Sequence, residues 1–186
     1  LTHLSRVPID VSKAEAQHSS YECALAEAGF EVIRLPNLPE HADGVFVEDT
    51  ALLLDGHAVI TRPGAASRAP ETSSAAAGLA GHFRLHRIKQ GYVDGGDVLR
   101  IGKTLYVGLS SRTDLKGIET LRELVRPLGF EVVHARLDGC LHLKTGATLA
   151  GPDRTGNAVL LYHPGSVDPS QFAGVEPVAV DAEEPG

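Results

Sequence analysis

Methionine and tryptophan are absent from this chain of 186 residues, and Met is missing even at position 1. The chain opens on Leu and ends in DAEEPG directly after the strand-like VEPVAV. These two features predict a chain that is incomplete at both ends. Aromatic residues make up only 5% of the sequence, so the core is expected to consist mainly of Val, Leu, Ile and Ala.

Cysteine is almost as scarce, with only Cys23 and Cys140. Two cysteines are too few for the disulfide framework of a small secreted protein. Cys23 lies within a helical pattern and is interpreted as a small buried packing residue, the usual role of a free cysteine. The scarcity favours a cytoplasmic protein with reduced thiols.

Long apolar runs and clusters of basic residues are also lacking. Apolar runs such as ALLL are far too short to span a bilayer, and no charged-then-apolar leader opens the chain. With 17 basic against 24 acidic residues the net charge is −7, which argues against membrane or nucleic acid as a partner. The 42% hydrophobic content is sufficient for one domain over residues 1–186, with a small molecule as the expected partner.

A repeated pattern fills the chain. Strand-like segments begin at Gly29, Gly81 and Gly129, about 50 residues apart, which is a spacing typical of repeat folds. A helical pattern precedes each segment, and a block of two short apolar runs follows it. The sequence therefore predicts units of helix, strand and two-stranded hairpin. The blocks open on Asp-Gly at Asp43, Asp94 and Asp138.

The segments between the blocks predict the helices. A helix is expected over residues 9–28, with Ser12 and Glu15 as a capping box and Gly29 as its stop, followed by a strand over 31–35. Ser67 is expected to cap a second helix that runs to Leu79. Thr113 is expected to cap a third helix over 114–128, with one apolar stripe.

Acidic residues gather at the start of the first two blocks. In VFVED the alternation of apolar residues predicts a strand, which crowds Asp43, Glu48 and Asp49 at one strand end. They are either solvated turn acids or ligands for a cation. In DGGD, two glycines between Asp94 and Asp97 permit close approach of another element, although turn chemistry explains this motif equally well.

Three further residues stand out by their neighbours. Arg62 precedes a proline that favours extended backbone, and it is either a loop-mouth ligand or a surface arginine. Arg112 stands beside the expected helix cap. His142, if it lies on a strand, shares a face with Cys140 and Lys144 and is either an acid/base group or a structural histidine. A Cys–His nucleophile or half a metal site is less favoured, since alternate strand residues lie about 7 Å apart.

Five motifs in order, VFVEDTALLL, AVITRPGAASR, VDGGDV, YVGLSSRT and LHLKTG, make the chain resemble the dimethylarginine dimethylaminohydrolase family of the guanidino-group-modifying (amidinotransferase) superfamily. The resemblance covers nearly the whole chain. It implies an α/β fold, a five-fold pseudosymmetric α/β propeller or pentein-like toroid built from repeats of about 50 residues. This chain is expected to hold an incomplete set of them.

The resemblance also implies an activity. A hydrolase of this family converts methylated arginines to citrulline and methylamine or dimethylamine through a covalent cysteine thiouronium intermediate, without a cofactor or metal. The nucleophilic cysteine is expected outside these 186 residues, so the chain alone is expected not to turn over. The alternatives are an arginine deiminase or amidinotransferase relative and a non-catalytic arginine-binding or methylarginine-binding toroid. A homodimer is left open as an assembly.

Residue roles follow from the same resemblance. His142 is implied to be the general acid and base, and Asp94 and Asp49 are implied to hold the substrate guanidinium. A delocalised cation favours paired carboxylates, and a carboxylate favours arginine. The remaining implied substrate ligands are Asp43 and Glu48, which position the substrate, Arg62 and Arg112, which bind its carboxylate, and Leu1, which matches a lid residue.

Overall fold

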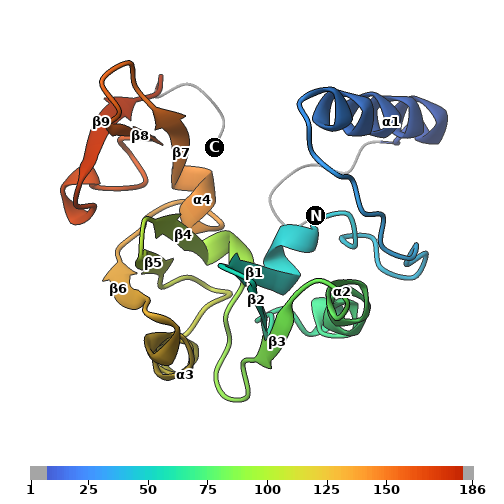
Figure 1. Ribbon diagram of the computed structural model, residues 1–186, viewed down its shortest axis with the longest axis horizontal. Helices are drawn as coiled ribbons and strands as arrows, with labels where there is room; N and C mark the ends of the chain where they lie inside the picture. Colours follow the sequence, from blue (N-terminus) through green and yellow to red (C-terminus); the bar gives the residue numbers. More distant parts are fainter. Residues whose placement is uncertain (1–7, 182–186) are drawn as a thin grey trace. The chain divides into compact units, whose positions relative to one another are not determined.

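The structure is a computed structural model that describes residues 8–181 (Figure 1). Leu1, an expected substrate ligand, lies outside the described residues. The chain divides into two units, residues 1–36 and residues 37–186, and each is described by itself. Within the described part of the chain, no helix combines the length and the apolar character needed to cross a membrane.

The first unit consists of helix α1, Val11–Glu27, and an irregular segment. The predicted capping box at Ser12 is wrong, because Asp10 is the N-cap and its carboxylate accepts a hydrogen bond of 3.0 Å from the Lys13 amide. A carboxylate at this position satisfies a free amide and also favours the positive end of the helix dipole. The predicted stop is confirmed, since Gly29 adopts a left-handed φ of 89°.

Two other predictions for the first unit are wrong. Cys23 is exposed rather than buried, and α1 has no buried residue in the described structure. Residues 31–35 are irregular rather than a strand. The physical reason is that these residues have no strand to pair with. In each sheet of the second unit the third strand pairs with the hairpin that precedes it in the chain. Among the described residues, no hairpin precedes residue 31.

The second unit contains three sheets with one shared topology. In each, an antiparallel hairpin is followed by a crossover and a third strand parallel to the middle one. This confirms a three-fold repeat and an α/β fold, with each sheet starting on its hairpin. The sheets comprise β1 Ala51–Leu54, β2 His57–Ile60 and β3 Arg84–Arg87; β4 Val98–Ile101, β5 Thr104–Gly108 and β6 Glu131–Ala135; and β7 Ala147–Pro152, β8 Ala158–Tyr162 and β9 Val175–Ala179.

The crossovers carry short helices. They are the 3-10 turn η2 Ala66–Arg68 with helix α2 Glu71–Leu79 in the first sheet, helix α3 Leu115–Val125 with the turn η4 Arg126–Leu128 in the second, and the turn η5 Pro169–Gln171 in the third. The end of α2 at Leu79 and the position of β3 agree with the sequence prediction.

Both predicted caps of these crossover helices are wrong. Ser67 lies inside η2, and α2 begins after Pro70 without a side-chain cap. The cap of α3 is Asp114 rather than Thr113. One oxygen of Asp114 accepts from the Gly117 amide at 2.7 Å and from the Tyr92 amide at 3.0 Å, so the same carboxylate holds the helix and the preceding loop together.

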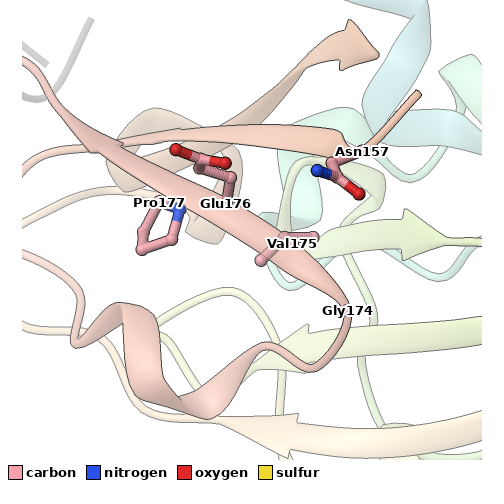
Figure 2. A pocket seen from close by; sticks show the side chains of 5 residues that line it. All are labelled: Asn157, Gly174, Val175, Glu176 and Pro177. Atoms are coloured by element: carbon pink, nitrogen blue, oxygen red, sulfur yellow. The ribbon is translucent and has the colours of Figure 1, made fainter. Parts of the chain in front are cut away.

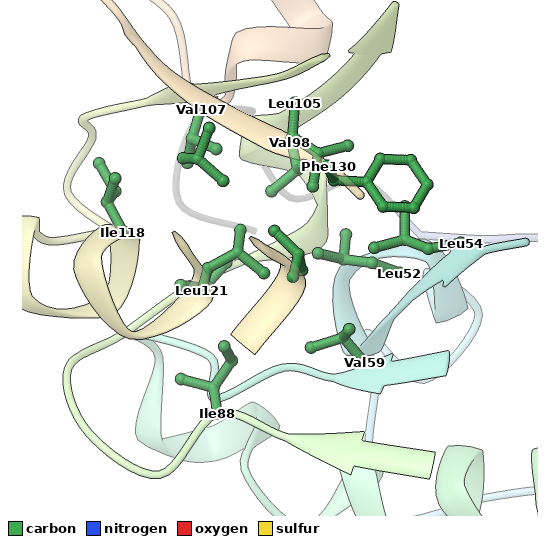
Figure 3. Close-up of a cluster of buried hydrophobic side chains, with 13 residues drawn as sticks. Leu52, Leu54, Val59, Ile88, Val98, Leu105, Val107, Ile118, Leu121 and Phe130 are labelled. Carbon is green, nitrogen blue, oxygen red and sulfur yellow. The ribbon is translucent and has the colours of Figure 1, made fainter. Parts of the chain in front are cut away.

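The middle sheet lies between two hydrophobic cores. Val98, Leu105 and Val107 pack in one core with strands of the first sheet and with α3 (Figure 3). Leu99 and Tyr106, on the alternate positions of the same two strands, pack in the other core with residues of the third sheet. Alternate residues of a strand point to opposite faces, so β4 and β5 contribute to both cores.

Candidate active site

Three short helical segments bring the candidate residues together in the second unit. They are the 3-10 turns η1 Val47–Thr50 and η3 Gly95–Asp97 and the single-turn helix α4 Leu143–Gly146. The predicted strands in VFVED and at His142 are therefore wrong. In η1 the neighbours Glu48 and Asp49 diverge, so that Asp49 is buried whereas the Glu48 side chain is 65% exposed and pairs with Lys144 at 2.5 Å.

The two glycines of η3 allow this turn to approach η1 and His142 closely, as the sequence predicts. A Cβ atom on Gly95 would lie 2.0 Å from the carbonyl oxygen of Glu48. A Cβ on Gly96 would lie 2.8 Å from both Asp49 Oδ1 and the His142 ring. The Gly96 amide instead donates to Asp49 Oδ1 at 3.1 Å, which joins η3 directly to η1.

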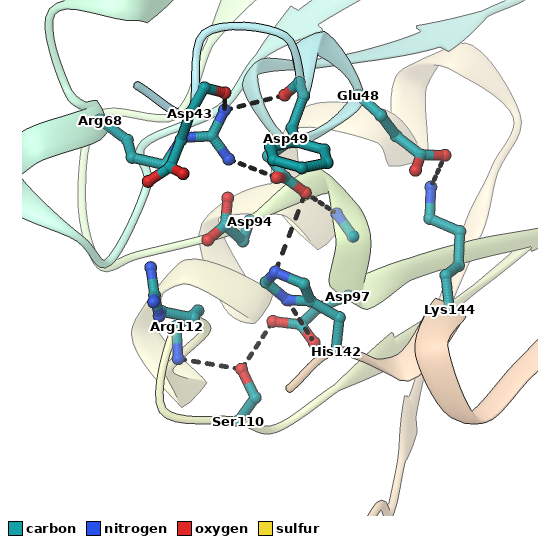
Figure 4. Close-up of polar contacts among 12 residues, drawn as sticks. Asp43, Glu48, Asp49, Arg68, Asp94, Asp97, Ser110, Arg112, His142 and Lys144 are labelled. Atoms are coloured by element: carbon teal, nitrogen blue, oxygen red, sulfur yellow. Dashed lines mark hydrogen bonds and ion pairs between the residues drawn. The ribbon is translucent and has the colours of Figure 1, made fainter. Parts of the chain in front are cut away.

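Asp49 also takes part in a buried ion network that sequence reasoning missed (Figure 4). The Arg68 guanidinium pairs with Asp49 Oδ2 and, at 2.7 Å, with Glu71 Oε2. It also donates to the carbonyl oxygens of Asp43 at 3.0 Å and Phe46 at 2.8 Å. Arg68 therefore fixes the backbone that leads into η1. A signal was available in the sequence, because Arg68, the last residue of AVITRPGAASR, precedes Glu71 by three residues, a spacing that suits an ion pair.

His142 stands at the N-cap of α4, between acidic residues from the other two segments. Its Nδ1 lies 3.5 Å from Asp97 Oδ1 and its Nε2 lies 3.9 Å from Asp49 Oδ1. Burial would lower the pKa of His142, but the carboxylate of Asp97, together with the charges of Asp49 and Asp94, outweighs burial and raises the pKa above its ordinary value. The charged imidazolium is thereby stabilised relative to that of an isolated histidine.

Asp94 is the most unusual group of the cluster. It is fully buried, and within residues 8–181 both carboxylate oxygens lack a hydrogen-bond partner. Burial first, and then the negative charge of Asp49, raise the pKa of Asp94 to about 6, although the charges of His142 and Arg68 act in the opposite direction. A buried carboxylate without a partner is costly, and such groups concentrate where a ligand supplies the missing contacts.

The remaining predicted ligands lie around this cluster to different degrees. Asp43 contributes its backbone carbonyl to the Arg68 network. Arg112 is half-buried, and its amide donates to Ser110 Oγ at 2.9 Å (Figure 4). Arg62 is exposed, and its guanidinium contacts the Gly91 carbonyl at 3.0 Å and the Tyr92 ring at 4.7 Å. The structure thus brings Asp49 and Asp94 together with His142, whereas the Glu48 side chain pairs with Lys144 and the Arg62 guanidinium contacts Gly91 and Tyr92.

Comparison with known proteins connects this geometry to named relatives. No protein-family model matches the chain. An N(G),N(G)-dimethylarginine dimethylaminohydrolase from Streptomyces coelicolor is 38% identical over 180 residues, which cover 96% of this chain and 68% of that protein. The chain belongs to the dimethylarginine dimethylaminohydrolase family. An N(G),N(G)-dimethylarginine dimethylaminohydrolase from Pseudomonas aeruginosa is 36% identical to this chain over 140 residues, which cover 74% of this chain and 55% of that protein.

A solved structure supports the family assignment. A mutant dimethylarginine dimethylaminohydrolase from Pseudomonas aeruginosa, complexed with citrulline, superposes with a TM-score of 0.85 at 32% identity. The match covers 95% of this chain and 68% of that one. The chain therefore spans between about half and two thirds of the length of these dimethylarginine dimethylaminohydrolases.

Cys140 stands two residues before His142 in this member of the dimethylarginine dimethylaminohydrolase family. Its Sγ donates to the backbone carbonyl of His142 at 3.3 Å rather than to the imidazole. Burial raises the pKa of the Cys140 thiol, which disfavours the reactive thiolate. Among the described residues, no three His, Cys, Asp or Glu side chains form a group that could hold a metal ion.

A separate hollow lies along β9, lined by Asn157 and residues 174–177 (Figure 2). Glu176 is its one acidic residue, and none of the residues that line it belongs to the acid cluster. Glu176 is exposed, whereas Asp49 and Asp94 of the acid cluster are buried.

Proposed function

We propose that this chain supplies the substrate-binding and proton-transfer residues of a hydrolase that converts N-ω-methylated arginines to citrulline and methylamine or dimethylamine. The unpaired, buried carboxylate of Asp94 carries this proposal. A substrate guanidinium provides N–H donors and a positive charge, the two things that this carboxylate lacks. The family relationship and the citrulline-bound relative support the same substrate class.

The acids of the cluster have different roles in binding the substrate. Asp94 receives the guanidinium, and Asp49 Oδ1 receives it from a second side while Asp49 Oδ2 stays paired with Arg68. Cation binding favours the ionised form of Asp94 and brings its pKa down from about 6. Asp43 and Glu48 position the substrate, Arg112 and Arg62 bind its carboxylate, and Leu1 belongs to the lid.

The reaction follows from these positions and a thiolate. A cysteine thiolate, expected from outside residues 1–186, attacks the guanidinium carbon and forms a carbon–sulfur bond. His142 donates its proton to the methylated nitrogen, and the carbon–nitrogen bond breaks to release the amine. Water then attacks the thiouronium carbon while neutral His142 takes a proton from it. The hydroxyl adduct loses its second proton to solvent as the carbon–sulfur bond breaks, which releases citrulline, restores the thiolate and leaves His142 protonated for the next cycle.

This function is proposed together with a fold of five repeats and a dimeric assembly. Three repeats of hairpin, crossover and parallel strand support a complete five-fold toroid around one central site. We propose that the whole enzyme is such a propeller, that it acts in the cytoplasm and that it forms a homodimer. Small-angle scattering and sedimentation velocity measure shape and assembly independently of activity.

The binding proposal is tested by isothermal titration calorimetry of asymmetric dimethylarginine into the chain. We expect measurable binding by the unmodified chain and at least tenfold weaker binding by Asp94→Asn, since an amide removes the negative charge that neutralises the guanidinium. Asp55→Asn removes a carboxylate that pairs with Arg100 and Lys103 on the surface, and serves as the charge control. Equal affinity of Asp94→Asn and the unmodified chain would overturn the assignment.

Binding of different ligands distinguishes a hydrolase of methylated arginines from an arginine deiminase or an amidinotransferase. The same titration with arginine is expected to give weaker binding than with dimethylarginine. A preference for unmethylated arginine would favour the alternative. A citrulline assay of the chain by itself is expected to show no turnover, because Cys140 has a raised pKa and contacts only the backbone of His142.

A further inference from the structure

Asp97 is a buried carboxylate that the residue roles described so far do not use. It is fully buried in the turn η3, three residues after Asp94. Its Oδ2 accepts hydrogen bonds of 2.6 Å from Ser110 Oγ and 2.6 Å from Thr113 Oγ1. Its Oδ1 accepts a hydrogen bond of 3.0 Å from the Leu143 amide. In all three contacts the oxygens of Asp97 accept the hydrogen bond.

These hydrogen bonds connect three segments of the site. Ser110 and Thr113 flank Arg112, and Ser110 Oγ accepts from the Arg112 amide at 2.9 Å. Thr113 Oγ1 accepts from the amide of Asp94 at 3.0 Å. Leu143 directly follows His142 in the chain. Asp97 is therefore bonded to the loop of Arg112 and to the segment that presents His142.

The position of Asp97 also decides which ring nitrogen of His142 faces which acid. Among the described residues Nδ1 is buried without a hydrogen-bond partner and lies 3.5 Å from Asp97 Oδ1, whereas Nε2 lies 3.9 Å from Asp49 Oδ1. Asp49 is already bonded to the Arg68 guanidinium and the Gly96 amide. Asp97 is thus the nearer acid, and its Oδ1 has one other contact. A carboxylate beside one imidazole nitrogen favours the tautomer that carries the proton on that nitrogen.

We propose that Asp97 is a positioning residue that keeps the proton of neutral His142 on Nδ1 and leaves Nε2 to exchange the proton of the reaction. The inference rests on the proposed function, in which His142 is the acid and base. Asp97 and Asp94 are both fully buried, but Asp97 accepts three hydrogen bonds. The oxygens of Asp94 have no hydrogen-bond partner among the described residues and are available to the substrate.

The charged groups around His142 define what a test must separate. Asp49 faces it from η1, and Asp94 and Asp97 face it from η3. On α4 itself, Lys144 pairs with Glu48. The position of Asp97 predicts two properties of His142 that can be measured in the absence of ligand. Its tautomer is set by the acid beside Nδ1, and its pKa is raised in part by that same charge.

Nitrogen-15 NMR of the histidine-labelled chain tests this directly, with the His142 signals assigned from His142→Gln. We expect Nδ1–H to be the main tautomer of neutral His142, whereas free histidine favours Nε2–H. In Asp97→Asn we expect His142 to titrate at lower pH and to lose its Nδ1–H preference. Ser110→Ala disturbs the same network but keeps the Asp97 charge, and it is expected to retain both properties.

Two results would overturn the proposal. One is a main Nε2–H tautomer in the unmodified chain, which decides the question even if Asp97→Asn fails to fold. The other is an unchanged His142 titration in a folded Asp97→Asn variant. Neither measurement uses a ligand, so failure of dimethylarginine binding would contradict the proposed function and leave the role of Asp97 to be decided by the NMR result.

Discussion

At the scale of single residues, the site holds two buried charged groups with opposite surroundings. Arg68 is paired with two carboxylates and two backbone carbonyls, so its charge and its donors are satisfied within the chain. Asp94 has no hydrogen-bond donor in the described part of the chain. The protein therefore stabilises one acid, Asp49, by means of Arg68, and leaves another acid ready for an external cation. This division accounts for the raised pKa of Asp94.

Asp94→Asn is predicted to stabilise the protein above about pH 6, in spite of its loss of ligand binding. The folded-state pKa of Asp94, about 6, lies above its ordinary value of 3.8, so the folded state binds the proton more tightly between these two values. The unmodified chain thus loses stability as pH rises through this window, and Asn does not titrate. The variant is expected to gain ~1–3 kcal/mol in free energy of unfolding relative to the unmodified chain.

Urea unfolding at pH 4, 6 and 8 measures this difference in both proteins. We expect it to shift in favour of Asn between pH 4 and pH 6 and to be nearly constant above. Asp55→Asn, at an exposed ion pair, serves as the control. A difference that is the same at all three pH values, or that shifts in favour of Asp94 as pH rises, would contradict the raised pKa.

At the scale of elements, local signals predicted the hairpins and missed the turns of the site. The Asp55-Gly56 turn needs only local backbone, and both residues adopt the expected positive φ. The η1 turn, by contrast, depends on Arg68, which bonds the carbonyl of Phe46 from 22 residues away. The α4 start depends on Asp97, 46 residues before Leu143. Alternation of apolar residues cannot reveal such distant partners.

The same reasoning explains which site residues were found. The resemblance placed Asp49, Asp94 and His142, and the structure brings these three together. Arg68 lacks the neighbouring proline that drew attention to Arg62, and nothing local shows that it is buried. Asp97 was visible in DGGD, but its hydrogen bonds to Ser110 and Thr113 form only in the folded chain.

Gly95→Ala is predicted to separate η3 from η1. The added Cβ would lie 2.0 Å from the backbone oxygen of Glu48, which cannot rotate away as a side chain can. We expect a loss of ~1–3 kcal/mol in free energy of unfolding, together with weaker dimethylarginine binding. Gly81→Ala is the matched control, because nothing lies within 4 Å of its added Cβ. Unchanged binding by Gly95→Ala would show that the contact between the turns does not shape the site.

At the scale of the second unit, the middle sheet makes the two cores interdependent. β4 and β5 place alternate residues in each core, so disruption of either core removes packing from the same two strands. Two turns of the acid cluster lead directly into strands that contribute to the cores, since η1 ends where β1 begins and η3 ends where β4 begins. Stability of the cores and geometry of the site are therefore connected.

Leu105→Ala and Leu160→Ala are each predicted to destabilise the second unit as a whole, so that both cores unfold in one cooperative thermal transition at a lower temperature. Leu105 is fully buried in the core shared with the first sheet, and Leu160 in the core shared with the third. Each truncation is expected to lower the free energy of unfolding by ~2–5 kcal/mol. Calorimetry is expected to show one lowered transition in both variants. A second transition in either variant would mean that the cores unfold separately.

The alternation along β5 has a consequence for how this sequence can diverge. Tyr106 stacks on Phe172 with ring centroids 4.9 Å apart, and its hydroxyl accepts from the Ala173 amide at 2.9 Å. Its neighbours Leu105 and Val107 pack with α3 instead. Adjacent positions of one short strand thus evolve against different parts of the chain. In an alignment of relatives, Tyr106 should covary with Phe172 and remain independent of the residues on either side of it.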